Sequence, residues 1–280
     1  MSAESVLNAK APILIQLQNF AFQKAKFWSI ALIGLQAFLF TGGFASIFSA
    51  RWSLSYPWLA FPLAVVGALI SVHATDLKGR AEWLKRQHEF LNGLGVTPSA
   101  RTLTNLQAEL PSDLKPGVDR LLTEGVTYAS EQSIGLPRLL ENVCESAFFS
   151  HHLASRCARY LLILLVFTGT IASSLLLFCL STLQDATTGV IAARAIAATL
   201  VFLISVGTIK SWRGYVNFSS KADLAYSEAT RLLKDTTPDS CEAHRVVAEY
   251  QLARANAPMI PTKVWLIHRD HLNKIWLSSH

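Results

Sequence analysis

Four long apolar runs, grouped into two pairs, limit the folds open to this chain more than any other feature. Three of them, 27–48, 57–74 and 160–183, contain no charged side chain, and the fourth, 189–209, contains only Arg194. A helix rises ~1.5 Å per residue and needs roughly 20 apolar residues to cross a hydrocarbon core of about 30 Å. The second run is close to the lower limit, and the others meet it. The runs therefore predict an all-α membrane protein with four transmembrane helices, arranged as two hairpins.

A soluble helical protein with a large core is the alternative, and the composition argues against it. The 280 residues are 51% hydrophobic and only 16% charged, with a mean hydropathy of +0.32. The polar residues are segregated into blocks, whereas the amphipathic helices of a soluble bundle spread them along one face. Pro62 falls in the first turns of the second predicted span, where a kink costs less than at the centre.

The basic residues predict which ends of the spans face the cytoplasm, because Lys and Arg accumulate in cytoplasmic loops beside transmembrane helices. Here they flank the N-terminal segment, both ends of the middle polar block and the start of the tail: Lys24, Lys26, Lys78, Arg80, Lys85, Arg86, Arg156, Arg159, Lys210 and Arg213. The two remaining connections, 49–56 and 184–188, carry one charge each. Both termini and the middle block are therefore predicted to be cytoplasmic.

The predicted spans divide the chain into five segments. They are an N-terminal amphipathic helix (1–26), a first transmembrane hairpin (27–74), a cytoplasmic helical block (75–159), a second transmembrane hairpin (160–209) and a cytoplasmic helical tail (210–280). Apolar residues at helical spacing predict that the second span continues into the cytoplasm until Gly93 and Gly95 end it. The same spacing predicts helices over 118–129, 136–160, 221–234, 241–257 and 262–277, with Asp239 or Ser240 capping the fourth.

No motif in the sequence favours an enzyme or a bound cofactor. The four cysteines form no CxxC pair, which fits free thiols in a reducing compartment. Neither His151-His152 nor the pair His268 and His271 is joined by a third residue at metal-ligand spacing. A nucleophile elbow and a carboxylate pair inside a span are also missing. We therefore predict no catalytic residue, no metal and no cofactor.

Two residues within the apolar runs are candidates for a pore lining. Arg194 lies in an alanine-rich run, and a guanidinium inside a span usually faces protein or water because exposing it to lipid is costly. One Arg194 per subunit would form a ring that favours anions. In the alternative interpretation, Arg194 lies close enough to the outer end of the span to reach the headgroups. His73, at the inner end of the second span, is either a pH-sensitive pore residue or an interfacial one.

A stretch after the fourth run mixes basic and aromatic residues. Lys210, Trp212, Arg213 and Tyr215 have the composition of a site that binds nucleotides by charge and ring stacking. Four basic residues at the cytoplasmic margins extend this candidate ligand site: Lys85, Arg86, Arg156 and Arg159. The same residue types also anchor transmembrane helices at the interface, which is the alternative interpretation.

Three segments resemble the SMODS-associated four-transmembrane effectors of bacterial anti-phage defence. They are Leu17-Gln18-Asn19-Phe20 through Lys26, Glu141-Asn142 through Tyr160, and the tail from Tyr250-Gln251 through Arg254, Asn256, Pro258 and Pro261 to Trp265. The tail is the most specific, although Ala257 separates Asn256 from Pro258, which adjoin in the family pattern. The architecture matches along essentially the whole chain.

This resemblance implies an oligomeric pore in the bacterial inner membrane that damages the cell's own membrane when infection is sensed. A nucleotide product of a partner nucleotidyltransferase controls such pores. In CBASS-like systems a cyclic oligonucleotide opens the effector, whereas in Hailong-type systems a short oligodeoxyadenylate holds a channel of this family shut. The Hailong-type arrangement is the closer expectation for this chain.

The N-terminal segment is predicted to act as a latch. Ile13, Leu14, Leu17 and Phe20 recur at helical spacing, so an amphipathic helix there would lie on a neighbouring subunit. The alternative is a helix that lies on the inner leaflet of the membrane.

These features predict a homo-oligomeric, anion-preferring ion channel, formed as a tetramer and acting as a defence effector. Four helices of one chain pack without enclosing a water path, whereas several subunits can surround one. The expected partners are the lipid bilayer, further copies of the chain, the oligonucleotide ligand and the nucleotidyltransferase that makes it. The alternative function is a membrane-anchored scaffold or sensor whose cytoplasmic helices recruit a partner protein.

Overall fold

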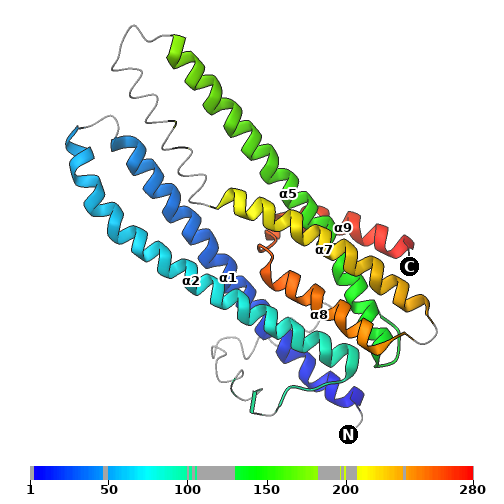
Figure 1. Cartoon of the computed structure of the whole chain (residues 1–280). Coiled ribbons are helices and arrows are strands. Elements are labelled where there is room, and N and C mark those ends of the chain that lie inside the picture. Colours follow the sequence, from blue (N-terminus) through cyan, green and yellow to red (C-terminus); the bar gives the residue numbers. More distant parts are fainter. Residues whose placement is uncertain are drawn as a thin grey trace.

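Every regular element in the described part of the chain is a helix. The computed structural model describes residues 3–46, 50–99, 101–102, 105, 130–181, 196, 199, 207–235 and 238–279. Its helices are α1 (Ala3–Ser46), α2 (Ala50–Leu94), α5 (Leu136–Ser181), α7 (Thr208–Lys234), α8 (Ser240–Asn256) and α9 (Thr262–Ser279), as Figure 1 shows. The predicted all-α class is confirmed for these residues. The predicted helix over 118–129 lies outside them.

Among the described residues, three helices are long and apolar enough to cross a membrane. The candidate spans lie within Ile13–Ser46 of α1, Ser55–Leu94 of α2 and Leu136–Ser174 of α5. The three helices contain 44, 45 and 46 residues, so each is about 66–69 Å long and more than twice the thickness of a hydrocarbon core of ~30 Å. Each helix therefore extends well beyond the part that a membrane covers. The fourth predicted span, 189–209, lies mostly outside the described residues.

The apolar segments of the long helices leave large side chains uncovered. Phe27 of α1 is 64% exposed, Trp58 of α2 is 85% exposed and Phe167 of α5 is 65% exposed. Soluble proteins rarely expose contiguous apolar surface on this scale. The exposure pattern fits an all-α membrane protein whose uncovered segments are surrounded by lipid.

The first hairpin is formed by α1 and α2, which lie side by side and antiparallel in Figure 1. Its N-terminal end has a small core of its own. Six buried residues form it: Leu14, Leu17 and Ala21 of α1 with Ala81, Leu84 and Leu91 of α2. The described part of the predicted amphipathic segment, residues 3–26, is thus the first part of one continuous helix, packed on α2 of the same chain.

α2 begins earlier than predicted. Residues 49–56 were expected to form the connection, whereas α2 already begins at Ala50. Two aromatic side chains fasten these extra turns to α1: Trp52 Nε1 donates a hydrogen bond to the carbonyl oxygen of Gly42 at 3.1 Å, and the Tyr56 hydroxyl donates to that of Leu39. Pro57 and Pro62 consequently lie inside α2, not at its start.

The C-terminal end of α2 matches the prediction. The helix continues past its apolar run and ends at Leu94. Gly95 follows with a left-handed φ of 70°, and its N–H donates to the carbonyl oxygen of Leu91 at 3.1 Å. A glycine at this position adopts the left-handed conformation without the clash that a Cβ would cause.

The main core lies where the first half of α5 meets α7, α8 and α9. The predicted apolar face of α5 is buried in this core: Leu139, Leu140, Val143, Ala147, Leu153 and Ala154.

The predicted helices α8 and α9 are confirmed, and Asp239 caps α8 by accepting a hydrogen bond from the Cys241 N–H at 3.1 Å. α7 differs, because it begins at Thr208 instead of 221 and follows Gly207 with its left-handed φ of 70°. The stretch 210–215, predicted as a ligand site or alternatively as an interfacial anchor, is therefore the start of a packed helix.

Candidate functional site

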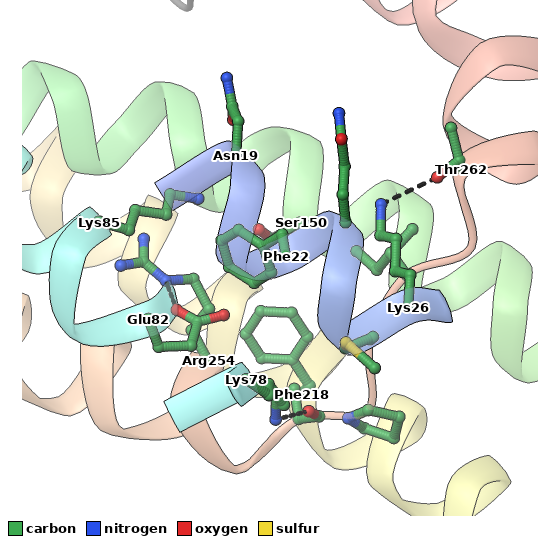
Figure 2. A pocket seen from close by; sticks show the side chains of 15 residues that line it. Asn19, Phe22, Lys26, Lys78, Glu82, Lys85, Ser150, Phe218, Arg254 and Thr262 are labelled. Atoms are coloured by element: carbon green, nitrogen blue, oxygen red, sulfur yellow. Dashed lines mark hydrogen bonds and ion pairs between the residues drawn. The ribbon is translucent and has the colours of Figure 1, made fainter. Parts of the chain in front are cut away.

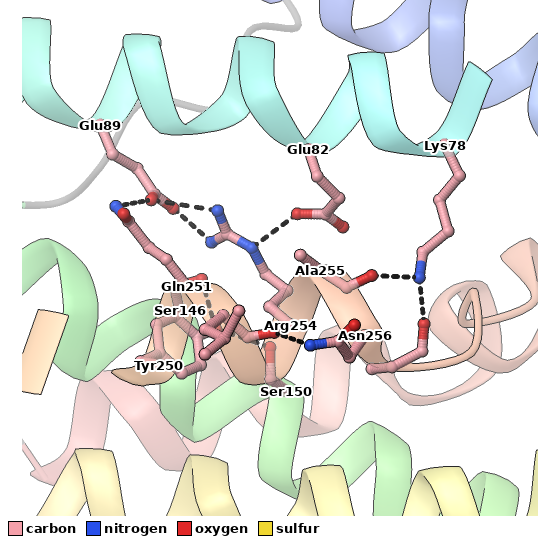
Figure 3. Close-up of polar contacts among 12 residues, drawn as sticks. Lys78, Glu82, Glu89, Ser146, Ser150, Tyr250, Gln251, Arg254, Ala255 and Asn256 are labelled. Carbon is pink, nitrogen blue, oxygen red and sulfur yellow. Dashed lines mark hydrogen bonds and ion pairs between the residues drawn. The ribbon is translucent and has the colours of Figure 1, made fainter. Parts of the chain in front are cut away.

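A buried arginine joins the tail to the first hairpin. Arg254 of α8 lies between two carboxylates of α2 (Figure 3). Its Nε donates to Glu82 Oε2 at 2.8 Å, and its Nη2 donates to Glu89 Oε2 at 3.1 Å. Nη1 donates to the other Glu89 oxygen, and Gln251 Nε2 adds a hydrogen bond to Glu89 Oε2 at 3.0 Å. We call these four residues the arginine clamp.

The clamp is almost closed to water. The side chain of Arg254 is 6% exposed, that of Glu89 2% and that of Glu82 10%. Burial by itself lowers the pKa of Arg254, but the charges of Glu89 and Glu82 outweigh it and hold this pKa well above its usual value. Buried charges persist only when they are paired and hydrogen-bonded. The clamp therefore fixes α8 against the C-terminal part of α2.

Two further contacts hold the clamp in place. The Tyr250 ring lies 5.4 Å from the guanidinium carbon of Arg254, and its hydroxyl lies 2.8 Å and 2.9 Å from the hydroxyls of Ser146 and Ser150 on α5. Burial raises the pKa of Tyr250, so this hydroxyl stays neutral. On the other side, Lys78 Nζ donates to the carbonyl oxygens of Ala255, at 2.7 Å, and of Ala257 (Figure 3). A cation there satisfies free carbonyls at the negative end of the α8 dipole.

A cavity of about 390 Å³ lies beside the clamp, between α1, α2 and the segment that joins α8 to α9 (Figure 2). Its lining includes three lysines, Lys26, Lys78 and Lys85, together with Arg254 and Glu82. The remaining lining residues are Asn19, Phe22, Gln23, Ser150, Phe218, Ala257, Pro258, Met259, Ile260 and Thr262. We call it the lysine cavity. Its size falls within the range of small-molecule sites.

One of the predicted basic ligand residues lines the lysine cavity. Lys85 lines the lysine cavity, whereas Lys210, Arg213, Arg156 and Arg159 are exposed on α7 and α5 and do not line it. The binding of a ligand by these four exposed residues stays a prediction.

The predicted aromatic contacts face the protein interior. Trp212 is half-buried against the main core. Tyr215 is 6% exposed, and its hydroxyl donates to the carbonyl oxygen of Met259 at 2.6 Å. Burial raises the pKa of this hydroxyl. A ligand base would have to break these contacts before it stacked on Tyr215. Arg86 is also half-buried, and its Nε has no hydrogen-bond partner among the described residues.

The predicted pore and latch residues lie elsewhere. Arg194 is outside the described residues. His73 is exposed on α2, and its ring packs edge-on against Trp28 of α1 with the centroids 5.6 Å apart. Leu14 and Leu17 are buried against α2 of the same chain, whereas Ile13 and Phe20 are half-buried. The two leucines are thus already covered without a neighbouring subunit.

The chain was compared with protein-family models, with curated proteins and with solved structures, and none of the three comparisons gives a match. Within the described residues, no group of three or more metal-ligating side chains lies together. The clamp and the cavity are therefore interpreted from their own chemistry. They define an all-α protein with membrane-length helices, whose tail is locked to the first hairpin beside a cationic cavity.

Proposed function

We propose that the chain is a four-pass ion channel of the bacterial inner membrane, with both termini in the cytoplasm. It assembles as a homo-tetramer, prefers anions, and acts as an anti-phage effector. A cyclic oligonucleotide or short oligodeoxyadenylate, made by a partner nucleotidyltransferase, controls its conductance. The sequence resemblance supports the ligand class and the defence role.

One structural observation carries the proposal that a cytoplasmic ligand controls the membrane part. α1, α2 and α5 continue as unbroken helices from their apolar segments into the cytoplasmic bundle. The arginine clamp and the lysine cavity contact α2 just beyond its apolar run, at Lys78, Glu82, Lys85 and Glu89. A ligand that moves the tail at this position acts on a rigid rod that extends into the membrane. A ligand can gate a channel only if it binds the open and the closed state with different affinity.

A membrane-anchored scaffold is the second candidate, and one observation favours it. The tail helices expose large apolar side chains to water: Leu252 is 63% exposed, Ile267 70% and Leu277 74%. Such residues are suited to binding a partner protein. A scaffold has no conductance, so the two functions are separable.

If the chain is a channel, the purified protein should conduct ions. Full-length protein reconstituted into dye-loaded liposomes should release the dye, and in planar bilayers it should give discrete current steps. Adding a cyclic oligonucleotide or an oligodeoxyadenylate to the cytoplasmic side should change the open probability. Protein-free liposomes provide the baseline. If neither dye release nor current is detected, with or without each ligand, the membrane-anchored scaffold is the better supported function.

Arg194→Glu should reverse the ion preference of the channel. A ring of guanidinium groups concentrates anions at the pore mouth, and a ring of carboxylates concentrates cations. Under a KCl gradient, the reversal potential should therefore change sign. Arg194→Lys keeps the charge and is the control. If the reversal potential of Arg194→Glu equals that of the unaltered protein, Arg194 is an interfacial anchor.

A further inference from the structure

We infer that the lysine cavity binds the phosphate of a small organic phosphate, the size of one mononucleotide or one phospholipid headgroup. The ligand class follows from the cavity itself. The consequence, control of the membrane helices by that ligand, rests on the proposed function.

Positive charge exceeds negative charge around the cavity. Three lysines and Arg254 line it, and Glu82 is the one carboxylate among the described residues of the lining. Glu82 Oε2 lies 2.8 Å from Arg254 Nε, and Glu89 forms an ion pair with the same guanidinium. The three lysines therefore outnumber the single negative charge that Arg254 leaves uncompensated. A phosphate that enters supplies the missing counter-charge in a partly desolvated site, where such attraction is stronger than in bulk water.

The lysines also retain unused hydrogen-bond donors. An ammonium group has three N–H bonds. Lys26 Nζ donates one of them to Thr262 Oγ1 at 2.9 Å, and Lys78 Nζ donates to two carbonyl oxygens. Lys85 makes no hydrogen bond with the part of the chain that the structure describes, although its chain lies along the cavity in Figure 2. Phosphate oxygens are acceptors that match these remaining donors.

The two helices of the first hairpin present matching polar stripes to this site. Positions i, i+4 and i+7 of a helix lie on one face. The lining contains such a triplet from each helix: Asn19, Gln23 and Lys26 of α1, and Lys78, Glu82 and Lys85 of α2. Both helices therefore direct polar groups at the same space, where a single ligand bridges them to the tail.

The rest of the lining limits the size and character of the ligand. Phe22, Phe218, Met259 and Ile260 form an apolar wall, suited to a nucleobase or the glycerol end of a lipid. A volume of about 390 Å³ accommodates one such group and is near the lower end of the roughly 300–1,000 Å³ typical of ligand pockets. Lys26 directly precedes the exposed apolar residue Phe27. The site is thus within reach of both a soluble phosphate and an inner-leaflet headgroup.

Calorimetric titration of the full-length protein tests this inference with dAMP as the probe. The protein is held in nanodiscs of phosphatidylcholine, and deoxyadenosine is the phosphate-free comparison. We expect dAMP to bind, deoxyadenosine not to bind, and Lys85→Gln to bind dAMP at least about tenfold more weakly, as expected for one lost charge-assisted hydrogen bond. Lys24→Gln is the matched control, because Lys24 is exposed on α1, lies over the Phe20 ring and does not line the cavity. It should bind as the unaltered protein does.

Nanodiscs of phosphatidylglycerol separate the two sources of phosphate. If this lipid competes with dAMP, a headgroup occupies the same lysines; if dAMP binds equally in both lipids, the site takes the soluble phosphate. If dAMP does not bind, native mass spectrometry should show that Lys85→Gln retains less phosphatidylglycerol than Lys24→Gln. The inference is overturned if neither phosphate depends on Lys85. It is also overturned if the double variant Lys210→Gln/Arg213→Gln weakens binding while Lys85→Gln does not.

Failure of this inference differs from failure of the proposed function. Calorimetry and mass spectrometry do not depend on ion flux. Binding without dye release removes the channel and keeps the phosphate site, whereas dye release without Lys85-dependent binding keeps the channel and removes the site.

Discussion

Arg254→Met should destabilise the protein by about 3–5 kcal/mol, the cost of removing one partner from a buried ion pair. Methionine fills a similar volume but leaves Glu82 and Glu89, which are 10% and 2% exposed, without the cation that is hydrogen-bonded to both. This is a large part of the roughly 5–15 kcal/mol that stabilises a typical domain. A denaturant titration of the purified protein in detergent micelles, followed by tryptophan fluorescence, measures the loss. Hydrogen exchange should locate it first in α8.

Arg245→Met is the matched control, because Arg245 lies on the same helix and also pairs with carboxylates. Its partners are Glu228, Glu242 and Glu249, at 3.3–3.6 Å. Its side chain is 48% exposed, so water and salt replace these pairs when the guanidinium is removed. We expect little change in stability. Equal losses in the two variants would mean that burial does not strengthen the arginine clamp.

A compensating variant separates charge from packing. Glu82→Gln and Glu89→Gln keep the shape of the two side chains and remove their charges. Added to Arg254→Met, they should recover much of the lost stability, because no buried carboxylate is then left without its arginine. If the triple variant is as unstable as Arg254→Met, the contribution of Arg254 is packing and hydrogen bonding instead of charge.

The arrangement of long helices could be predicted from the sequence because local signals decide it. Run length and charge predict the three membrane-length helices, and Gly95 and Asp239 mark helix ends by their own backbone and side-chain chemistry. The first turns of α2 were mispredicted because they depend on a distant partner. Trp52 and Tyr56 form hydrogen bonds to α1, which extend the helix through a stretch that reads locally as a loop.

The candidate site was mostly missed, although one signal for it was present. Lys78, Glu82, Lys85 and Glu89 follow one another at i, i+4, i+7 and i+11, a charged stripe on one face of α2. From the sequence alone, such a stripe is interpreted as a helix face exposed to water. What converts it into a buried clamp is the approach of α8, a contact between residues more than 160 positions apart. Tyr215 is the opposite case, because its basic surroundings suggested a ligand contact, whereas Tyr215 itself is 6% exposed and its hydroxyl donates to the carbonyl oxygen of Met259, in the segment before α9.

Gly93→Ala should destabilise the docking of the first hairpin onto α5 by about 1–3 kcal/mol, the usual cost of overpacking. A Cβ at Gly93 would lie 2.8 Å from Leu139 Cβ and 2.9 Å from Leu139 Cα, and a backbone atom cannot move aside as a flexible side chain can. Gly79→Ala on the same helix is the control, since a Cβ there meets nothing within 4 Å. It should stabilise α2 by up to about 1 kcal/mol through helix propensity. The same denaturant titration compares the two alanine variants, and opposite signs of change are expected. If Gly93→Ala is as stable as Gly79→Ala, α2 and α5 do not make this close contact, and α5 then contributes nothing at this position to the link between the first hairpin and the main core.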